Sequence, residues 1–447
     1  MKNLEQVRAE IREQEIELIR FVYIDNDGVV RGYAVTPEVF EGDLAAGHSY
    51  AEVMPFFSVM DDLVPGSIFG CTGEISGVPD LNTFRILPHA PHSAMMICDF
   101  RRSSDHSPTG LCARTLLKEY LAGLEYEAKA AFENEFYLVV KDEDGTYRPF
   151  DRSVCFATAG MNLQHEVVLD IVRNLKAQGL VIEKYYPEYG KGQVEIVYKY
   201  GAALDTADNQ VLFRETVKGT AARHGVIATF MPKPFQDLAG SGAHLHLSLF
   251  QDGRNLLYDP QAPDQLSQAG RHFLGGLRQH LPALCAFTAS TVNSYKRLVP
   301  HHWASAYNCW GLQNREAALR VVSGLRGREE ASFNIEIKPV DPACHPHLVV
   351  LAALAAGMDG LRNELDPGEP VLVDPYTLTG EEREKMGIHR LPVTLDQALT
   401  ALENDPFYRD LLGRVFYDEY LKMKRFAWTR YIEHVSDWEK ALYLEVF

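Results

Sequence analysis

The sequence predicts an α+β protein in which a small β-rich unit precedes a larger unit of mixed strands and helices. Residues 15–100 contain short apolar runs separated by turn formers, a pattern typical of strands. From residue 113 onward, strand patterns alternate with long amphipathic helix patterns, without internal repeats. The 447 residues are also too many for one compact core. We therefore expect two domains, residues 1–106 and residues 107–447.

The N-terminal unit is expected to open with a helix and continue with a hairpin. Helical spacing of apolar residues over positions 2–20 predicts a helix that passes into a strand. Two apolar runs around Asn-Asp-Gly in residues 19–30 predict a β-hairpin, because this tripeptide favours a tight turn. Residues 93–100 form another apolar strand pattern, and Ser-Pro-Thr-Gly at 107–110 predicts a linker.

The larger unit is expected to build a second core from strands and long helices. Strands are predicted at residues 131–140, 192–198, 243–248 and 333–338, and helices at residues 113–124, 166–178, 204–224 and 345–365. The last of these helices is mostly apolar, so we expect it to be buried. Residues 395–447 have an amphipathic helical pattern rich in aromatic residues, which predicts a closing layer over the core.

Composition and charge restrict the functional classes. Because 44 Lys and Arg face 61 Asp and Glu, a net charge of −17, we expect neither a nucleic acid nor a membrane as partner. The start lacks a signal-peptide core, and no apolar run reaches the ~18 residues of a membrane span. Seven scattered cysteines without C-x-x-C spacing predict reduced thiols and a cytoplasmic location. Any metal ion must then be bound by carboxylates and imidazoles.

Residues 231–248 combine an irregular loop, rich in Pro and Gly, with a strand pattern. In the strand, apolar residues alternate with His244, His246 and Ser248, so both imidazoles and the hydroxyl project from one face. Such a polar row suits a metal ion or a phosphate. The alternative for two histidines alone is an exposed strand face.

Acidic residues occur in a pattern that suits a divalent cation. Glu133 and Glu135 share one face of a predicted strand, where their charges repel unless a cation lies between them, although an exposed edge is the alternative. Glu188 and Glu195 flank a glycine-containing turn, and Glu336 lies on another predicted strand. Five carboxylates with one imidazole favour Mg²⁺ or Mn²⁺ over structural zinc.

Arginines accompany these acids. Arg297 ends the segment Asn-Ser-Tyr-Lys-Arg, and Arg315 and Arg320 belong to Asn-Arg-Glu-Ala-Ala-Leu-Arg. The planar guanidinium suits carboxylate or phosphate oxygens. A single arginine is more often a surface group, but the set beside a carboxylate cluster indicates phosphoryl transfer.

In this order, the segments resemble glutamine synthetase, and most closely the glutamine-synthetase-like γ-glutamyl-amide ligases. The shared motifs include Glu-x-Glu-Phe at 133–136, Gly-Ser-Gly-x-His-x-His at 240–246 and Asn-Ser-Tyr-Lys-Arg-Leu-Val-Pro at 293–300. The resemblance covers essentially the whole chain, most clearly residues 130–365. It implies a β-grasp-like N-terminal domain and a catalytic domain with a curved antiparallel sheet flanked by helices. It also implies a homo-oligomeric double ring with active sites between subunits.

The resemblance implies a role for each candidate residue. One metal ion would be held by Glu133, His244 and Glu336, and the other by Glu135, Glu188 and Glu195. ATP would be bound by His246, Ser248, Arg315, Arg320 and Lys338, and the reaction centre would include Arg297, Arg315 and Trp303, with Arg297 on a carboxylate of glutamate. In the implied reaction, ATP phosphorylates the γ-carboxylate of glutamate, and an amine then attacks the γ-glutamyl phosphate and releases phosphate. A catalytically silent scaffold is a further alternative, which the complete set of candidate ligands argues against.

The loop after Pro300 departs from the family. Glutamine synthetases carry there a glutamate that helps to bind and deprotonate ammonium, whereas this chain has Trp303, in a segment (298–309) without any acid. An alkylamine or polyamine is protonated at neutral pH and needs a carboxylate, but a weakly basic arylamine is already neutral. With Tyr307 and Trp310 nearby in sequence, we expect an aromatic or apolar, aniline-like amine. The alternatives are a polyamine or alkylamine, and ammonium.

Other departures concern the acyl donor. Ala239 replaces an amide expected near the amino end of glutamate, and Asn334 and Lys338 replace two arginines. Lys338 keeps the charge but loses the bidentate fork. The segment expected to supply an acid to a neighbouring subunit aligns poorly, and Asp61 and Asp62 are the candidates. Glutamate therefore remains the expected acyl donor, but the sequence supports this prediction less strongly than it supports the metal site.

Overall fold

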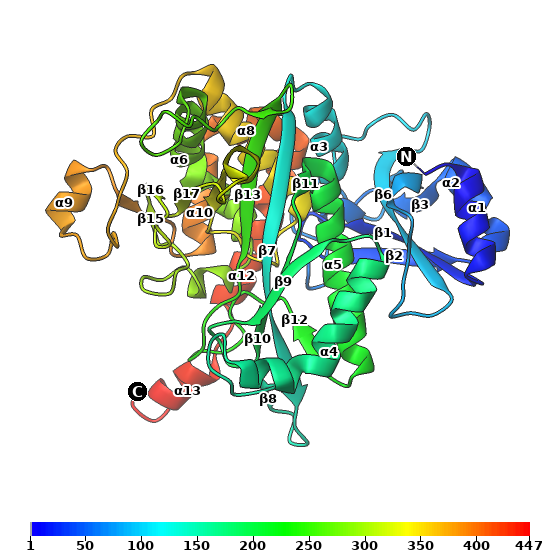
Figure 1. Ribbon diagram of the computed structural model, residues 1–447. Helices are drawn as coiled ribbons and strands as arrows, with labels where there is room; N and C mark the ends of the chain where they lie inside the picture. The colour runs from blue at the N-terminus through cyan, green and yellow to red at the C-terminus, as the bar shows by residue number, and fades with distance from the viewer. Residues whose placement is uncertain (1) are drawn as a thin grey trace.

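The computed structural model describes residues 2–447, and its N-terminal part is built on a small mixed sheet (Figure 1). The strands are β1 (Leu18–Ile24), β2 (Val30–Val35), β3 (His48–Ala51), β4 (Glu74–Pro79), β5 (Arg85–Ile86) and β6 (Ser93–Arg102). The predicted hairpin is confirmed, because β1 pairs antiparallel with β2. On its other side β1 runs parallel to β6, and the sheet has the order β2-β1-β6-β4-β3.

Two helices pack on this sheet. These are α1 (Leu4–Glu13) and α2 (Pro37–Ala46), with short 3₁₀ turns η1 (Met54–Phe56) and η2 (Leu81–Thr83) in the connections. Val7 of α1 and Phe40 of α2 join Phe21 and Met96 of the strands in one buried cluster. A mixed sheet covered by helices agrees with the β-grasp-like domain that the resemblance implied.

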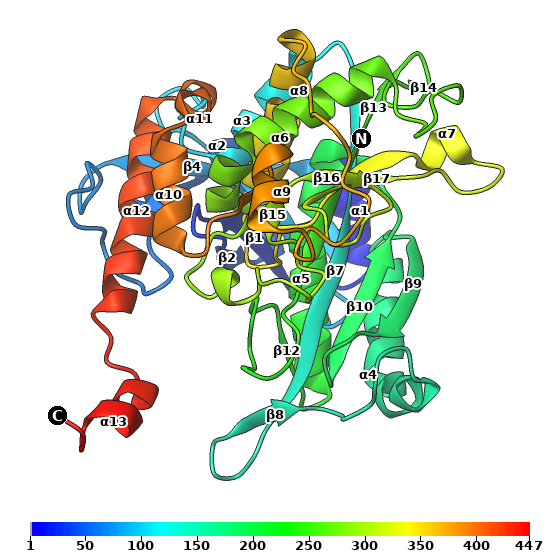
Figure 2. The same cartoon turned by 90° about the vertical axis from the view of Figure 1, so that its left-hand side faces the viewer.

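The larger part contains an 11-stranded sheet whose central path runs β16-β17-β18-β13-β7-β10-β9. Its strands are β7 (Glu127–Lys141), β8 (Tyr147–Pro149), β9 (Ile182–Pro187), β10 (Gln193–Tyr198), β11 (Gly201–Ala202), β12 (Ile227–Thr229), β13 (Ala243–Gln251), β14 (Arg254–Asn255), β16 (Trp310–Leu312), β17 (Leu319–Val322) and β18 (Asn334–Ile337). Within residues 2–447, its pairings are antiparallel except that of β16 with β17. The long strand β7 runs through the middle of the molecule in both views (Figures 1 and 2). A separate pair joins β15 (Tyr307–Asn308) to β19 (His389–Arg390).

The remaining helices belong to the larger part of the chain. They are α3 (Ala113–Ala122), α4 (Thr158–Ala177), α5 (Ala203–Arg223), α6 (Gln268–Thr288), η3 (Ser294–Lys296), α7 (Glu329–Ser332), α8 (Pro346–Arg362), α9 (Gly380–Lys385), α10 (Leu395–Glu403), α11 (Pro406–Leu412), α12 (Arg414–Ile432) and α13 (Asp437–Tyr443). The predicted buried helix is α8, which packs against α6. Their backbones approach closely at Gly276, where a Cβ atom would lie 2.1 Å from the carbonyl oxygen of Ala356.

Two helix predictions need correction. The helix expected from residue 166 begins at Thr158, because tertiary contacts stabilise its first turns: Gln164 is fully buried and donates to Asp151 at 2.7 Å. The C-terminal helical pattern divides into four helices, and only α10 to α12 belong to the closing layer. The last helix, α13, projects away from the body (Figure 2), and its Trp438 is 66% exposed.

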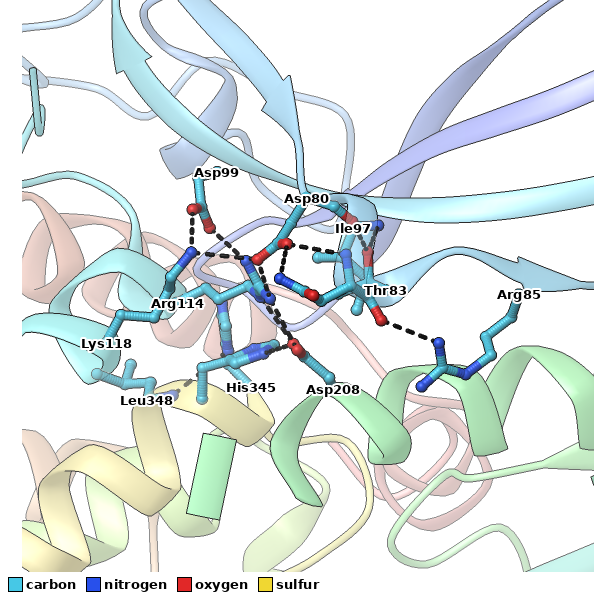
Figure 3. A network of polar contacts seen from close by, with 12 residues as sticks. Asp80, Thr83, Arg85, Ile97, Asp99, Arg114, Lys118, Asp208, His345 and Leu348 are labelled. Atoms are coloured by element: carbon cyan, nitrogen blue, oxygen red, sulfur yellow. Dashed lines mark hydrogen bonds and ion pairs between the residues drawn. The ribbon is translucent and has the colours of Figure 1, made fainter. Parts of the chain in front are cut away.

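A buried ionic network joins the small sheet to the helices of the larger part (Figure 3). Arg114 of α3, which is 3% exposed, donates to Asp99 at 2.7 Å, to Asp80 at 3.0 Å and to Asp208 at 2.7 and 2.8 Å. Lys118 adds contacts to Asp80 and Asp99. Although burial opposes ionisation, these cations hold the pKa values of Asp80 and Asp99 below their usual range. The network therefore stabilises the contact between the small sheet and the helices of the larger part.

All seven cysteines are unpaired, as expected. Among the helices of residues 2–447, none combines the length and the apolar character that crossing a membrane requires.

Candidate active site

One large cavity collects the residues that the sequence singled out for chemistry. It has a volume of about 920 Å³ and is bordered by residues of β7, β10, β13 and β18. The lining includes Glu133, Glu135, Glu188, Glu195, His244, His246, Ser248, Arg297, Trp303, Arg315, Arg320, Glu336 and Lys338. The fold therefore brings these residues into one site.

The strand register explains why these side chains meet. The opposed pairs are Glu133 with His244, Glu135 with Glu195, and His246 with Glu336. Directly opposed residues of antiparallel strands project from the same face of a sheet. The register of four neighbouring strands therefore turns all of these groups toward the cavity.

Three carboxylates form the first cluster: oxygens of Glu135, Glu188 and Glu195 all lie within 4.8 Å of one another. Glu195 is 3% exposed, and its Oε1 has no hydrogen-bond partner. Burial and the charges of neighbouring carboxylates raise the pKa values of Glu188 and Glu195. The amides of Gln193 and Gly242 donate to Oε2 of Glu135 at 3.1 and 2.8 Å, which orients this carboxylate. The donor set fits an oxygen-bound cation such as Mg²⁺ or Mn²⁺, because the cation removes the repulsion and supplies the missing partner.

The second cluster contains Glu133, His246 and Glu336, whose ligand atoms also lie within 4.8 Å of one another. His244 adjoins it, because its Nδ1 lies 3.2 Å from Oε1 of Glu336 and 3.7 Å from Oε2 of Glu133. The resemblance assigned His244 to this metal ion and His246 to ATP. The structure places both imidazoles within reach of the same two carboxylates.

The two imidazoles differ in their remaining contacts. Nε2 of His244 accepts from Arg297 at 3.2 Å, and its Nδ1 lies 3.2 Å from Oε1 of Glu336. Nδ1 of His246 lies 2.8 Å from Oδ1 of Asn334, whereas its Nε2 is buried without a hydrogen-bond partner, 3.6 Å from Oε2 of Glu133. Contact geometry therefore favours His246 as the imidazole that is available to bind a metal ion, whereas motif position favours His244.

Positive groups lie directly beside the second cluster. Glu336 is 1% exposed, and despite burial its pKa is held well below the usual range by Lys338 and the two imidazoles. Nζ of Lys338 lies 3.5 Å from Oε1 of Glu336, and Arg320 donates to Oε2 at 2.9 Å. Charges of both signs at one wall can hold a metal ion together with phosphate oxygens.

Arg297 is 4% exposed, yet it lines the cavity with a buried Nη1 that has no hydrogen-bond partner. Its Nη2 donates to the carbonyl oxygen of Lys338 at 3.2 Å. Gly240 and Gly242 make room for it, because a Cβ atom at either position would lie 2.6 Å from the Arg297 side chain. A buried guanidinium nitrogen without a partner is suited to binding a carboxylate.

Of the aromatic side chains that line the cavity, three are more than half exposed. Phe156 is 58% exposed, Tyr189 is 70% exposed and Trp303 is 57% exposed. The guanidinium carbon of Arg315 lies 6.0 Å from the Trp303 ring. Only Trp303 was identified from the sequence. The position of Tyr189 directly after Glu188 was a usable signal, whereas no local pattern marks Phe156.

Tyr307 and Trp310 do not contribute to this surface, so that expectation was wrong. Trp310 is fully buried, and its Nε1 donates to the carbonyl oxygen of Gly368 at 2.9 Å. Tyr307 lies between the guanidinium groups of Arg383 and Arg390. The short strands β15 and β16 turn both rings away from the cavity, which proximity in sequence does not reveal.

The acids expected from the N-terminal part lie elsewhere. Asp61 forms an ion pair with Arg31 at 2.8 Å, and neither Asp61 nor Asp62 is among the cavity residues of its own chain.

Comparison with known proteins agrees with this geometry. The model for the glutamine synthetase N-terminal domain matches residues 2–109, and the model for the glutamine synthetase catalytic domain matches residues 110–443. A glutamine synthetase of Halobacterium salinarum is 36% identical over 99% of this chain and 96% of its own length. The gamma-glutamylpolyamine synthetase GlnA3 of Streptomyces coelicolor is 32% identical over 93% of this chain and 90% of its own. A solved GmaS/ADP complex superposes with a TM-score of 0.86 at 29% identity, with 100% of both chains covered.

The two domain models together span almost the whole chain, and the cavity contains the acidic, histidine and arginine positions on which the resemblance rested. The chain belongs to the glutamine synthetase family of ATP-dependent carbon–nitrogen ligases.

Proposed function

We propose that this enzyme joins the γ-carboxylate of glutamate to an organic amine, and that the preferred amine is aromatic or apolar. The observation that carries the proposal is that three exposed aromatic side chains line the cavity, Phe156, Tyr189 and Trp303, which we call the aromatic wall. Aromatic rings provide a large apolar contact area with preferred stacked or edge-on geometry, which suits a ring-bearing amine.

The balance of acids supports the same choice. Six acidic residues line the cavity, and five of them belong to the two carboxylate clusters; Glu183 is the sixth. A protonated alkylamine needs a carboxylate that binds it and removes a proton before attack. An arylamine reaches the site neutral, so it needs no carboxylate among the cavity residues beyond those of the two clusters.

The two clusters would hold Mg²⁺ or Mn²⁺, with Glu135, Glu188 and Glu195 at one site and Glu133, Glu336 and a histidine at the other. When bound, the metal ions would neutralise charge on the phosphoryl group in transfer. His246, Ser248, Arg315, Arg320 and Lys338 would bind ATP, and Arg297 would bind a carboxylate of glutamate.

The reaction would proceed in two displacements. An oxygen of the γ-carboxylate attacks the terminal phosphorus of ATP, and ADP leaves. The amine nitrogen then attacks the acyl carbon, the bond from carbon to the phosphate oxygen breaks, and the nitrogen loses a proton as the amide forms. Arg315 and Arg320 would stabilise the charge of the departing phosphate. Closure of the loop that carries Trp303 would exclude water and so protect the acyl phosphate from hydrolysis.

Two alternatives have specific support. GlnA3, at 32% identity, is named a gamma-glutamylpolyamine synthetase, and several relatives at 32–36% identity are named glutamine synthetase. A polyamine or ammonium would both require an acidic group near the amine. In an oligomer, a neighbouring subunit could supply that group, for example Asp61 or Asp62.

We also propose that the enzyme works as a homo-oligomeric double ring with active sites between subunits, as the resemblance implies. Exposed apolar side chains in the loop that carries Asp61 support an interface there, since Val59, Leu63 and Ile68 are 60%, 51% and 65% exposed.

The test is a substrate panel. Steady-state ADP release is measured with ATP, Mg²⁺, glutamate and, in turn, aniline, methylamine, putrescine and ammonium, and each amide product is identified by mass spectrometry. We expect the highest kcat/KM with the arylamine. Preference for putrescine would reject the aromatic choice and indicate an acid from a neighbouring subunit, and preference for ammonium would make the protein a glutamine synthetase.

A further inference from the structure

The loop that presents Trp303 has an unusual backbone. His301, Trp303 and Ser305 have φ angles of 63°, 50° and 63°, in the left-handed region that residues other than glycine rarely adopt. Three such residues in five positions are energetically unfavourable unless contacts from elsewhere hold them. The source of those contacts therefore determines where the indole of Trp303 stands.

Residues 314–317 supply two of the contacts. Oε1 of Glu316 accepts a hydrogen bond from the backbone N–H of Trp303 at 3.1 Å. Ser305, which is fully buried, donates its hydroxyl to the carbonyl oxygen of Ala317 at 2.9 Å. Asn314 fixes this segment in turn, because its amide donates to the carbonyl oxygens of Val371 and Val373 at 2.7 and 2.9 Å.

A second segment holds the other side of the loop. Nδ1 of His301 lies 3.2 Å from Oδ2 of Asp374, and its ring meets that of Tyr376 edge-on at 4.2 Å between centroids. Contacts from other segments thus hold the loop at His301, Trp303 and Ser305, while the Trp303 side chain itself remains 57% exposed. Glu316 contacts the backbone of Trp303 and is not among the cavity residues.

We propose that Glu316 is a positioning residue that fixes Trp303 as the amine-facing wall, an inference that rests on the proposed function. Its carboxylate holds the Trp303 backbone in the left-handed conformation, so that the indole faces the cavity. Glu316 would set the affinity for the amine without touching ATP or glutamate.

The test compares Glu316→Ala with Glu316→Gln, because glutamine keeps an acceptor oxygen and alanine removes it. Glu381→Ala, at an exposed glutamate of α9, is the matched control. The first readout is hydrogen–deuterium exchange of the peptide that covers residues 299–309 in the full-length protein. A hydrogen bond to an ionised acceptor shifts an opening equilibrium by about 10- to 100-fold. We expect the amide of Trp303 to exchange faster in Glu316→Ala than in the wild type. In Glu316→Gln the increase should be smaller, and in Glu381→Ala the exchange rate should not change.

The second readout is steady-state kinetics, which separates changes in KM from changes in kcat. Glu316→Ala should raise the KM of the best amine in the panel about tenfold and leave the KM of ATP nearly unchanged. Unchanged exchange at Trp303, or equal increases in the KM of ATP and of the amine, would overturn the inference. Trp303→Ala separates this from failure of the proposed function: if that change leaves the amine KM unaltered while Glu316→Ala still speeds exchange, Glu316 positions the loop but the aromatic wall is not the amine site.

Discussion

Replacing Glu195 by Gln should stabilise the metal-free protein and also remove most of the stabilisation that Mg²⁺ provides. Glu195 is 3% exposed, and its cluster has three carboxylate oxygens within 4.8 Å of one another. At that separation two unit charges repel by about 3 kcal/mol for an effective dielectric constant near 20. Because burial and its neighbours raise the pKa of Glu195, protonation already relieves part of this repulsion. We therefore expect a net gain of about 1–2 kcal/mol in the free energy of unfolding of Glu195→Gln without metal.

With metal the order of stability should reverse. A ligand at 100 times its Kd stabilises the native state by about 2.7 kcal/mol, which the wild type gains and Glu195→Gln largely loses. For a chain of 447 residues, 1 kcal/mol corresponds to about 1 °C in Tm, from an unfolding entropy of about 2.1 cal/mol/K per residue.

Thermal unfolding in EDTA and across a Mg²⁺ titration is the measurement. The expected result is that Glu195→Gln melts about 1–2 °C above the wild type in EDTA and below it in saturating Mg²⁺. Glu183→Gln is the matched control, because Glu183 lines the same cavity but belongs to neither cluster. A variant that is less stable than the wild type in EDTA, or that keeps the full Mg²⁺ shift, would refute the assignment of this cluster as a metal site.

Four further predictions follow from the same site and from the ionic network. Arg297→Ala should raise the KM of glutamate far more than that of ATP, because Arg297 lines the cavity and its buried Nη1 has no hydrogen-bond partner; a defect confined to ATP would contradict this role in steady-state kinetics. Mn²⁺ titrations followed by electron paramagnetic resonance should show which imidazole is a ligand: His246→Ala loses a binding site if contact geometry decides, and His244→Ala does so if motif position decides. Trp303→Glu should move the preference of the amine panel toward ammonium, and an unchanged ranking would exclude this residue from amine selection. Arg114→Met should lower the free energy of unfolding near pH 7 by about 3–5 kcal/mol, since it leaves buried carboxylates unpaired. The pKa values of the surrounding aspartates are lowered, so the network stabilises the protein above about pH 4, the unfolded-state value, and this contribution is lost as the pH falls through the folded values. Acid unfolding curves of the variant should accordingly be flatter than those of the wild type.

The local sequence pattern was sufficient to predict which side chains share a face of the central strands. Alternation of apolar and polar residues put His244, His246 and Ser248 on one side, and β13 begins at Ala243 as this alternation predicts. Glu133 and Glu135 were assigned to one face of β7 by the same argument. Side chains alternate across a strand whatever its neighbours are, so this information is present in the order of residues.

Predictions failed where contacts between distant segments decide the outcome. The first turns of α4 have a weak helical pattern and are held by Asp151 through Gln164. Trp310, which we expected near the substrate, is enclosed by the core because β16 pairs with β17. Phe156 reaches the cavity from an irregular segment without periodicity, so no sequence pattern could have identified it.

The amino-acid sequence alone predicted which types of side chain meet at the site. These are carboxylates and imidazoles, which suit a divalent cation, arginines, which suit anions, and an aromatic residue where an acid was expected. Which strands are neighbours, and in which register, followed only from the folded chain, since pairing depends on the packing of every element around the sheet. That register buries Glu195 with no hydrogen-bond partner on its Oε1, and it leaves Nε2 of His246 without one. In the loop of Trp303, Glu316 accepts a hydrogen bond from the backbone N–H while the ring remains 57% exposed at the cavity. Distances and burial of this kind determine pKa values and contacts, and they come from segments far apart in the chain.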